Sequence, residues 1–145
     1  MDLAMTMSRV RYYRAMFYSG AIYNFSVAIS LVLAFENFYP LLGGGDIPQS
    51  PLFSLFLQIT MGLVFLFGVI YGLIGYRPEA ESSGILASLG IAGKLFFFFI
   101  MSGYAAAGLI PWGLAAVSFV DLFYSLLFIE YMLYRSSVAK QERSR

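Results

Sequence analysis

The sequence predicts an all-α integral membrane protein, an antiparallel four-transmembrane-helix bundle that forms a single domain over residues 1–145. Two features of its composition predict this fold. Of the residues, 60% are hydrophobic and only 12% are charged, whereas a soluble domain averages about 45–50% apolar and about 25% charged residues. In addition, the apolar residues gather in four blocks, each long enough to cross about 30 Å of hydrocarbon as a helix. We expect short cytoplasmic tails and no second, water-soluble domain.

The first two blocks predict helices over residues 12–36 and 51–76. The first apolar run is too long for a signal peptide and lacks a small-residue cleavage pattern near its end, so we expect this helix to be retained. Ser50 followed by Pro51 predicts the start of the second helix, with serine as the N-cap and proline at the first helical position. The connection over residues 37–50 is either a plain connector or a lid on the membrane surface.

The last two blocks predict helices over residues 83–107 and 111–134. Ser82 or Ser83 is the expected N-cap of the third helix, and Gly108 is expected to end that helix in a left-handed conformation. Pro111 is expected at the first position of the fourth helix. Because only a few residues separate these two helices, they should be antiparallel neighbours.

The positions of the basic residues predict a protein of the cell membrane (inner or plasma membrane) with both termini in the cytoplasm. All but one of the nine Lys and Arg residues lie around the start of the first helix, in the turn between the second and third helices, or after the fourth helix. An excess of Lys and Arg marks the cytoplasmic side of a membrane protein. The short basic tails offer no large basic surface, so no nucleic-acid partner is expected.

The chain contains neither cysteine nor histidine. This composition excludes disulfides, thiol redox chemistry and histidine-ligated haem, copper or zinc. It also removes the commonest general base near neutral pH. We therefore predict no cofactor, no metal site and no catalytic residue.

The most informative residues are Lys94 and Asp121, in the middle of the third and fourth predicted helices. A charge at the bilayer centre costs about 2.5–3.5 kcal/mol even on a lenient insertion scale, so such residues usually face a partner or a cavity. Counted from opposite faces of the membrane, Lys94 lies about 17 Å deep and Asp121 about 15 Å deep. We therefore predict that the two side chains form an ion pair.

Other polar side chains converge at the same depth. Tyr124 lies one helical turn from Asp121, while Tyr23 and Asn24 lie near mid-membrane on the first helix. A mostly apolar pocket with a few fixed polar groups is the usual form of a small-molecule site. The predicted ligand site opens between the first, third and fourth helices and comprises Tyr23, Asn24, Lys94, Asp121 and Tyr124. Serine stripes on the first and fourth helices fit either close packing or pocket lining.

Short sequence features resemble those of the DoxX-like small four-helix bacterial membrane proteins. These features are Tyr23-Asn24, Tyr71-Gly72, Gly93-Lys94 and Asp121, one in each successive helix. In layout the resemblance covers the whole helical region. It implies a four-helix membrane fold and an association with redox systems, some of them linked to quinones, but it carries over no functional residue.

Three functions remain open. The first is a non-enzymatic integral membrane protein, either an accessory subunit of a membrane complex or a binder of a small lipophilic ligand. The second is a redox or enzyme subunit that binds a quinone or lipid substrate, with Lys94, Asp121 and Tyr124 handling protons. The third is a small oligomeric channel or transporter that uses the Lys94–Asp121 pair as a gate or as a coupling site.

We favour the first function because the chain has no redox or metal ligands and only a small soluble portion. The expected partners are the lipid bilayer, a membrane protein or a second copy of this chain, and a lipophilic small molecule.

Overall fold

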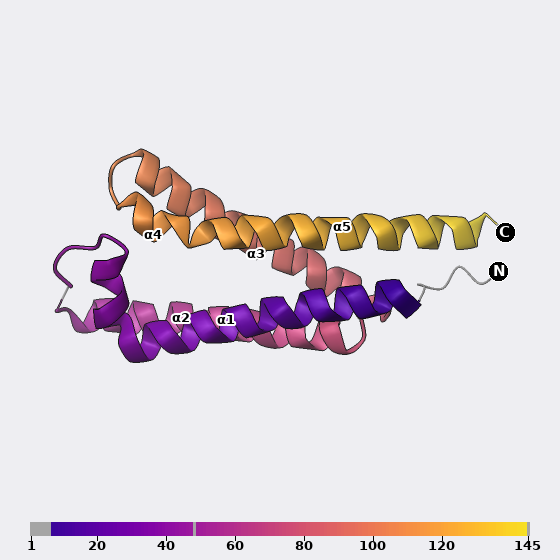
Figure 1. Cartoon of the computed structure of the whole chain (residues 1–145), viewed down its shortest axis with the longest axis horizontal. Helices are drawn as coiled ribbons and strands as arrows, with labels where there is room; N and C mark the ends of the chain where they lie inside the picture. Colours follow the sequence, from indigo (N-terminus) through magenta and orange to yellow (C-terminus); the bar gives the residue numbers. More distant parts are fainter. Residues whose placement is uncertain (1–6, 48, 145) are drawn as a thin grey trace.

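The computed structural model describes residues 7–47 and 49–144, and this part of the chain is helical with no strand (Figure 1). The helices are α1 (Met7–Leu41), α2 (Pro51–Tyr76), α3 (Glu81–Ala106), α4 (Trp112–Ala116) and α5 (Ser118–Arg143). Four stretches are long and apolar enough to cross a membrane: α1, α2, α3 and the combined α4–α5 stretch Trp112–Gln141. The prediction of an all-α chain with four membrane-length apolar helices is confirmed.

Helix α1 extends beyond both ends of the predicted segment 12–36, and it is interrupted at Ala34, whose backbone is not helical (φ −138°, ψ 28°). Residues 37–41, which were predicted to lie in a connector, are therefore helical. The aromatic ring of Phe35 stacks on Tyr39 at 5.0 Å and packs on Phe53 of α2 at 5.5 Å. The local pair of rings and the tertiary contact with α2 together stabilise a short helical piece that the sequence analysis did not predict.

Local signals place the start of α2 and the end of α3 correctly. Ser50 is the N-cap residue and Pro51 the first helical residue, although the serine side chain makes no capping hydrogen bond. Gly108 adopts φ +71°. The amides of Gly108 and Leu109 donate to the carbonyls of Ala105 and Tyr104, at 3.0 and 2.9 Å. This pair of bonds is the Schellman arrangement that a left-handed glycine allows.

The predicted serine cap of α3 is wrong, because α3 begins at Glu81 and its N-cap residue is Ala80. The hydroxyl of Ser83 instead donates to the carbonyl of Arg77 at 2.7 Å, and so closes the turn between α2 and α3. Serine side chains compete for nearby backbone groups in this way.

The predicted single helix over residues 111–134 is also wrong in detail. Pro111 occupies the N-cap position of α4 rather than its first helical position, and the helix is interrupted at Val117. The Val117 carbonyl accepts an i+3 bond from the Val120 amide and a side-chain bond from the Tyr23 hydroxyl, both at 3.3 Å. An i+3 bond of this kind tightens the backbone locally.

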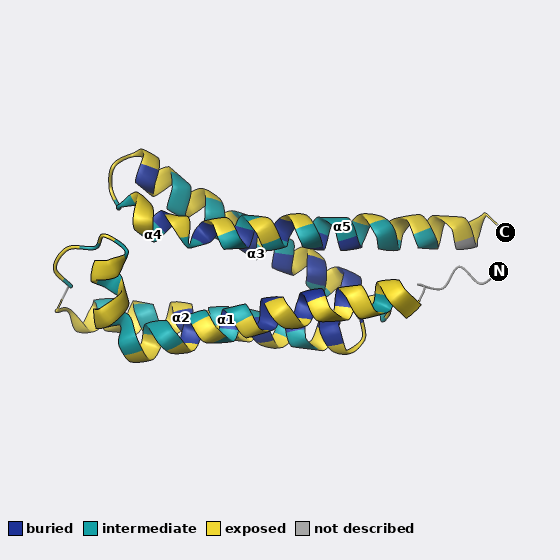
Figure 2. Cartoon of the chain, viewed as in Figure 1, coloured by how far each residue is buried: buried dark blue, intermediate teal, exposed yellow. Residues whose placement is uncertain are grey.

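The long helices pack chiefly as two pairs, α1 with α2 and α3 with α5. The pairs meet through a buried, mostly aromatic core in the half of the molecule that is nearer the termini (Figure 2). Its fully buried rings are Tyr13, Phe17, Tyr71, Phe128 and Tyr131. Direct contact between α1 and α5 is sparse. The two pairs are therefore joined mainly through α2 with α3 and through the side chains of this core.

Polar contacts at the terminal end tie α1 to α5. Glu130 accepts hydrogen bonds from Arg9 at 3.0 Å and from the Tyr13 hydroxyl at 2.9 Å. Arg135 of α5 donates to the Pro78 carbonyl at 3.2 Å. Both Glu130 and Arg135 thus fasten α5 to other parts of the chain at this end.

Candidate functional site

Lys94 and Asp121 form an ion pair inside the molecule, between Nζ and Oδ1. Lys94 lies in the middle of α3 and Asp121 in the first turn of α5, and their exposed fractions are only 5% and 9%. The predicted pairing is confirmed. Each charge lowers the cost of burying the other, although such a pair seldom stabilises a fold more than well-packed apolar residues would.

Asn24 connects this ion pair to the other helix pair. Its side-chain oxygen accepts a hydrogen bond from Lys94 Nζ at 3.3 Å, and its side-chain nitrogen donates to the Val64 carbonyl of α2 at 3.1 Å. Asn24 is itself buried. One polar network therefore joins α1, α2, α3 and α5 at the same level of the molecule.

Three tyrosine rings surround the Lys94 ammonium. The distances from Nζ to the ring centroids of Tyr23, Tyr71 and Tyr124 are 5.6, 5.4 and 5.4 Å. An ammonium within about 6 Å of an aromatic face is attracted by the ring, and more strongly where water is excluded. These rings therefore replace part of the hydration that Lys94 loses on burial.

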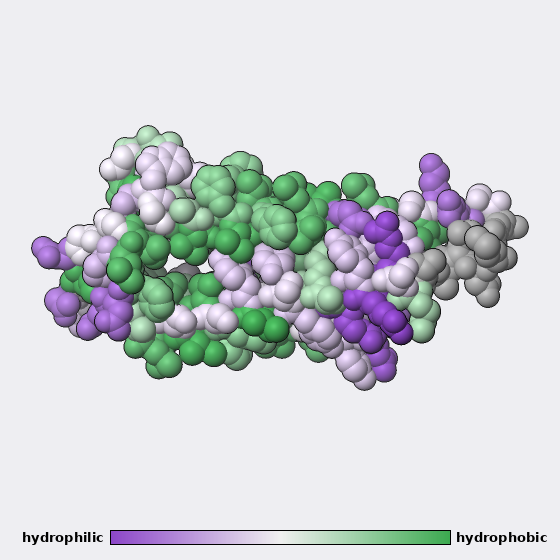
Figure 3. All heavy atoms as spheres, in the orientation of Figure 1, coloured by the Kyte–Doolittle hydropathy of each residue, from purple (hydrophilic) through white to green (hydrophobic). Residues whose placement is uncertain are grey.

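An apolar cavity of about 140 Å³ adjoins the ion pair. Its polar end is formed by Tyr23, Asn24, Lys94 and Asp121, and much of the rest is aliphatic or aromatic. Figure 3 shows a hollow on this face between α1 and the α4–α5 segment. The structure therefore brings four of the predicted site residues to one cavity.

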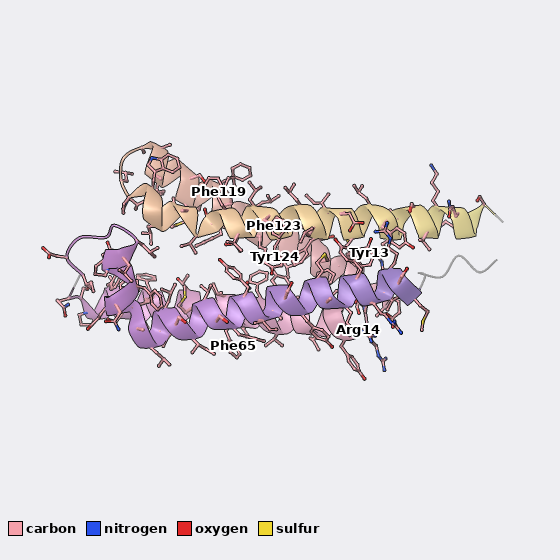
Figure 4. The ribbon with its side chains drawn as sticks, in the orientation of Figure 1. Tyr13, Arg14, Phe65, Phe119, Phe123 and Tyr124 are labelled. Atoms are coloured by element: carbon pink, nitrogen blue, oxygen red, sulfur yellow. The ribbon has the colours of Figure 1, made fainter. Side chains whose placement is uncertain are left out.

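Tyr124, the fifth predicted residue, does not line this cavity. Its hydroxyl donates to Ser19 of α1 at 3.1 Å, and its ring stacks on Tyr23 with centroids 5.9 Å apart. Figure 4 shows Tyr124 between α5 and α1, with Phe119 of the same helix on another side. Tyr124 touches the site through Lys94 and Tyr23, and it lines a separate shallow hollow beside Tyr12.

Helix α2 contributes to the cavity, which sequence reasoning placed between the other three helices. Phe67 and Tyr71 of α2 line it, and they can approach α3 because Gly93 and Gly90 face them there. A Cβ atom at Gly93 would lie 2.9 Å from the Phe67 ring, and one at Gly90 would lie 2.7 Å from the Tyr71 ring. The sequence feature that could have indicated the approach of these two residues to α3 is the pair of glycines on that helix.

Three serines on the polar stripes bond to backbone carbonyls three or four residues before them in the chain. Ser19 donates to the Met16 carbonyl, Ser118 to Ala115 and Ser125 to Asp121, at 2.7, 2.7 and 2.8 Å. No serine lines the cavity in residues 7–47 and 49–144. Of the two interpretations of these stripes, the structure favours packing.

The covering segment, which comprises the short helical piece after Ala34 and the following residue Leu42, lies at the other end of the cavity. Phe35, Tyr39 and Leu42 line it there. The backbone carbonyl of Leu42 lies against α4, where a Cβ at Gly113 would be only 2.5 Å from the carbonyl oxygen. A glycine at this position therefore permits the covering segment to rest directly on α4.

The site offers apolar volume, hydrogen bonds and a fixed pair of opposite charges. Within the described residues, no group of three or more carboxylates, histidines or cysteines could hold a metal ion. No protein-family model matches the chain, and comparisons with curated proteins and with solved structures give no match either. The DoxX-like resemblance therefore stays a prediction.

Proposed function

We propose that this chain is a non-enzymatic, multi-pass protein of the cell membrane that binds a small, neutral, lipophilic molecule. The supporting observation is the apolar cavity that ends on the buried Lys94–Asp121 pair. In this proposal the four long helices cross the bilayer as an antiparallel bundle with both termini in the cytoplasm. The resemblance to DoxX-like proteins is compatible with this layout.

The surface supports a membrane location. Large apolar side chains are exposed along all four long stretches, among them Leu33, Leu66, Ile85, Phe96 and Leu133. Figure 3 shows the strongly hydrophilic residues gathered towards the two ends of the molecule. Apolar surface of this extent on a monomer marks contact with lipid or with other proteins.

The proposed topology can be tested by labelling, because the chain has no cysteine of its own. Gln49→Cys, in the exposed connection between α1 and α2, should react with an impermeant thiol reagent from outside intact cells. Ser137→Cys, exposed near the C-terminus, is the matched control and should react only after permeabilisation. The reverse pattern would show that the basic end faces outwards, against the positive-inside rule.

The size of the cavity limits the ligand. An apolar protein cavity of about 150 Å³ is known to accommodate benzene, and the cavity here measures about 140 Å³. Sites for larger molecules usually measure about 300–1,000 Å³. The bound portion is therefore one ring or a short chain, and the rest of a larger molecule would lie outside the cavity.

The charges at its polar end limit the ligand further. A net anion would be repelled by Asp121 and a net cation by Lys94, and either would compete with the existing ion pair. Separating two paired charges in a medium of low dielectric constant is costly. A neutral molecule is the one that leaves the pair intact.

We expect p-xylene, a neutral ring of suitable size, to bind the detergent-solubilised protein at one saturable site. Val27→Phe places a larger side chain in the wall of the cavity and should abolish this binding. Val69→Phe is the matched control, because Val69 is exposed and lies outside the cavity wall. Titration calorimetry on the three proteins measures the effect.

Two results would contradict ligand binding. One is a folded wild-type protein that takes up no neutral one-ring compound, p-xylene included, beyond partitioning into the detergent. The other is equal binding by the wild type and Val27→Phe. Either result would favour the alternative role as an accessory subunit of a membrane complex.

A further inference from the structure

The hydrogen bonds around the ion pair leave one acceptor free. Oδ1 of Asp121 pairs with Lys94, whereas no described residue donates a hydrogen bond to Oδ2 of the same carboxylate. Asp121 is 9% exposed and lines the cavity. A carboxylate oxygen in a largely enclosed side chain that borders a cavity can accept a hydrogen bond from a molecule in that cavity.

Three other polar groups at this end of the cavity already have partners, whereas the hydroxyl of Tyr71 has none in the described part of the chain. Lys94 donates to Asp121 and Asn24 and lies among three tyrosine rings. Asn24 accepts from Lys94 and donates to Val64. The Tyr23 hydroxyl donates to the Val117 carbonyl. The Tyr71 hydroxyl, which belongs to the same cavity lining, is buried and has no partner among the described residues. The site therefore offers an acceptor at Asp121 and a donor at Tyr71, and a hydroxyl group, which can both donate and accept, is the complement of the two.

We propose that the cavity selects neutral lipophiles that carry a hydroxyl group, and in particular one-ring phenols, whose O–H donates to Oδ2 of Asp121. This inference rests on the proposed ligand-binding function. A hydroxyl bonded to a carboxylate forms a short, charge-assisted hydrogen bond, which is stronger than a bond between neutral groups. It also leaves the Lys94–Asp121 pair in place, whereas a cationic donor would compete with Lys94.

The aromatic wall of the cavity supports the choice of a phenol. Rings from three helices line it, including Tyr23 of α1, Phe67 of α2 and Phe97 of α3. Aromatic pairs in offset or edge-to-face arrangements are favourable beyond the burial of their area. A flat ring with a single hydroxyl therefore matches both the wall and the free acceptor.

The test compares p-cresol with p-xylene, two rings of nearly the same shape that differ in one hydroxyl. Titration calorimetry on the full-length protein gives the ratio of their affinities, first for the wild type and then for Lys94→Met/Asp121→Leu. The double variant removes both charges together and keeps the volume filled, so it should still fold. We expect the ratio to favour p-cresol about tenfold or more in the wild type relative to the double variant, as a hydrogen bond to a charged group predicts.

The comparison of ratios removes the difference in how the two compounds partition into detergent. Arg9→Met/Glu130→Gln is the matched control, because it alters the ion pair at the terminal end, which does not line the cavity. Its ratio should equal that of the wild type.

The outcomes separate the two proposals. If p-xylene binds but the ratio is unchanged in Lys94→Met/Asp121→Leu, the hydroxyl preference is wrong and ligand binding stands. An equal loss of preference in the control variant would also overturn it, since the effect would not depend on Asp121. If neither compound binds the folded wild type, the proposed function itself fails.

Discussion

Lys94→Met alone, or Asp121→Leu alone, is expected to lower the free energy of unfolding of the detergent-solubilised protein by about 3–5 kcal/mol. Each single change leaves the partner charge buried without its counter-ion, because both side chains are almost fully enclosed. The double change Lys94→Met/Asp121→Leu should recover most of this loss, since replacing both members of a buried pair is often close to neutral. Denaturant unfolding of the three variants and the wild type measures the coupling.

Arg9→Met provides the control for this prediction. The Arg9–Glu130 pair is solvent-accessible, with side-chain exposures of 47% and 42%, and exposed pairs contribute about 0–1 kcal/mol. The decrease in the free energy of unfolding caused by Arg9→Met should therefore be small. Single changes at Lys94 or Asp121 that cost no more than Arg9→Met would show that the two residues do not depend on each other.

The second large effect is expected at Gly90, where α3 approaches α2. The Cβ atom of Gly90→Ala would meet the Tyr71 ring at 2.7 Å. Tyr71 is fully buried and packs on Phe128 with ring centroids 4.9 Å apart, so it cannot move freely. We expect a loss of about 1–3 kcal/mol in the free energy of unfolding, the usual cost of overpacking.

Gly103→Ala is the matched substitution on the same helix. Nothing lies within 4 Å of a Cβ atom at Gly103, so this change should be neutral or stabilise α3 by up to about 1 kcal/mol through helix propensity. The comparison is made by thermal and denaturant unfolding. If Gly90→Ala proves as stable as Gly103→Ala, the close contact between α2 and α3 is not formed.

The sequence predicts helices well where their ends carry local signals. The predicted segment 51–76 coincides with α2, because Ser50 and Pro51 define its start and Arg77 and Pro78 its end. The interruptions at Ala34 and Val117 have no such signal. The interruption at Ala34 accompanies the packing of the neighbouring Phe35 on α2. The interruption at Val117 accompanies the hydrogen bond that the Tyr23 hydroxyl donates to the Val117 carbonyl. Contacts between distant segments determine these features, and helical periodicity does not show them.

The ion pair could be predicted because charge stands out in an apolar helix. The similar depths of Lys94 and Asp121 along two neighbouring helices were enough to predict that the two side chains form a pair. Tyr124 shares a helix face with Asp121, but its ring turns towards Ser19 and Tyr23 instead of the cavity. The contribution of Phe67 could not be recognised in the same way, because an aromatic residue in an apolar helix has no contrast with its neighbours.

In the proposed function, a small neutral molecule occupies the cavity beside Lys94 and Asp121. The most direct measurement is a structure of the protein with 4-bromotoluene, in which anomalous scattering locates the bromine atom. We predict one bromine site inside the cavity, bounded by α1, α2, α3 and α5, next to the ion pair. A packed interior at this place, with bromine found only on the lipid-facing surface, would contradict the claim.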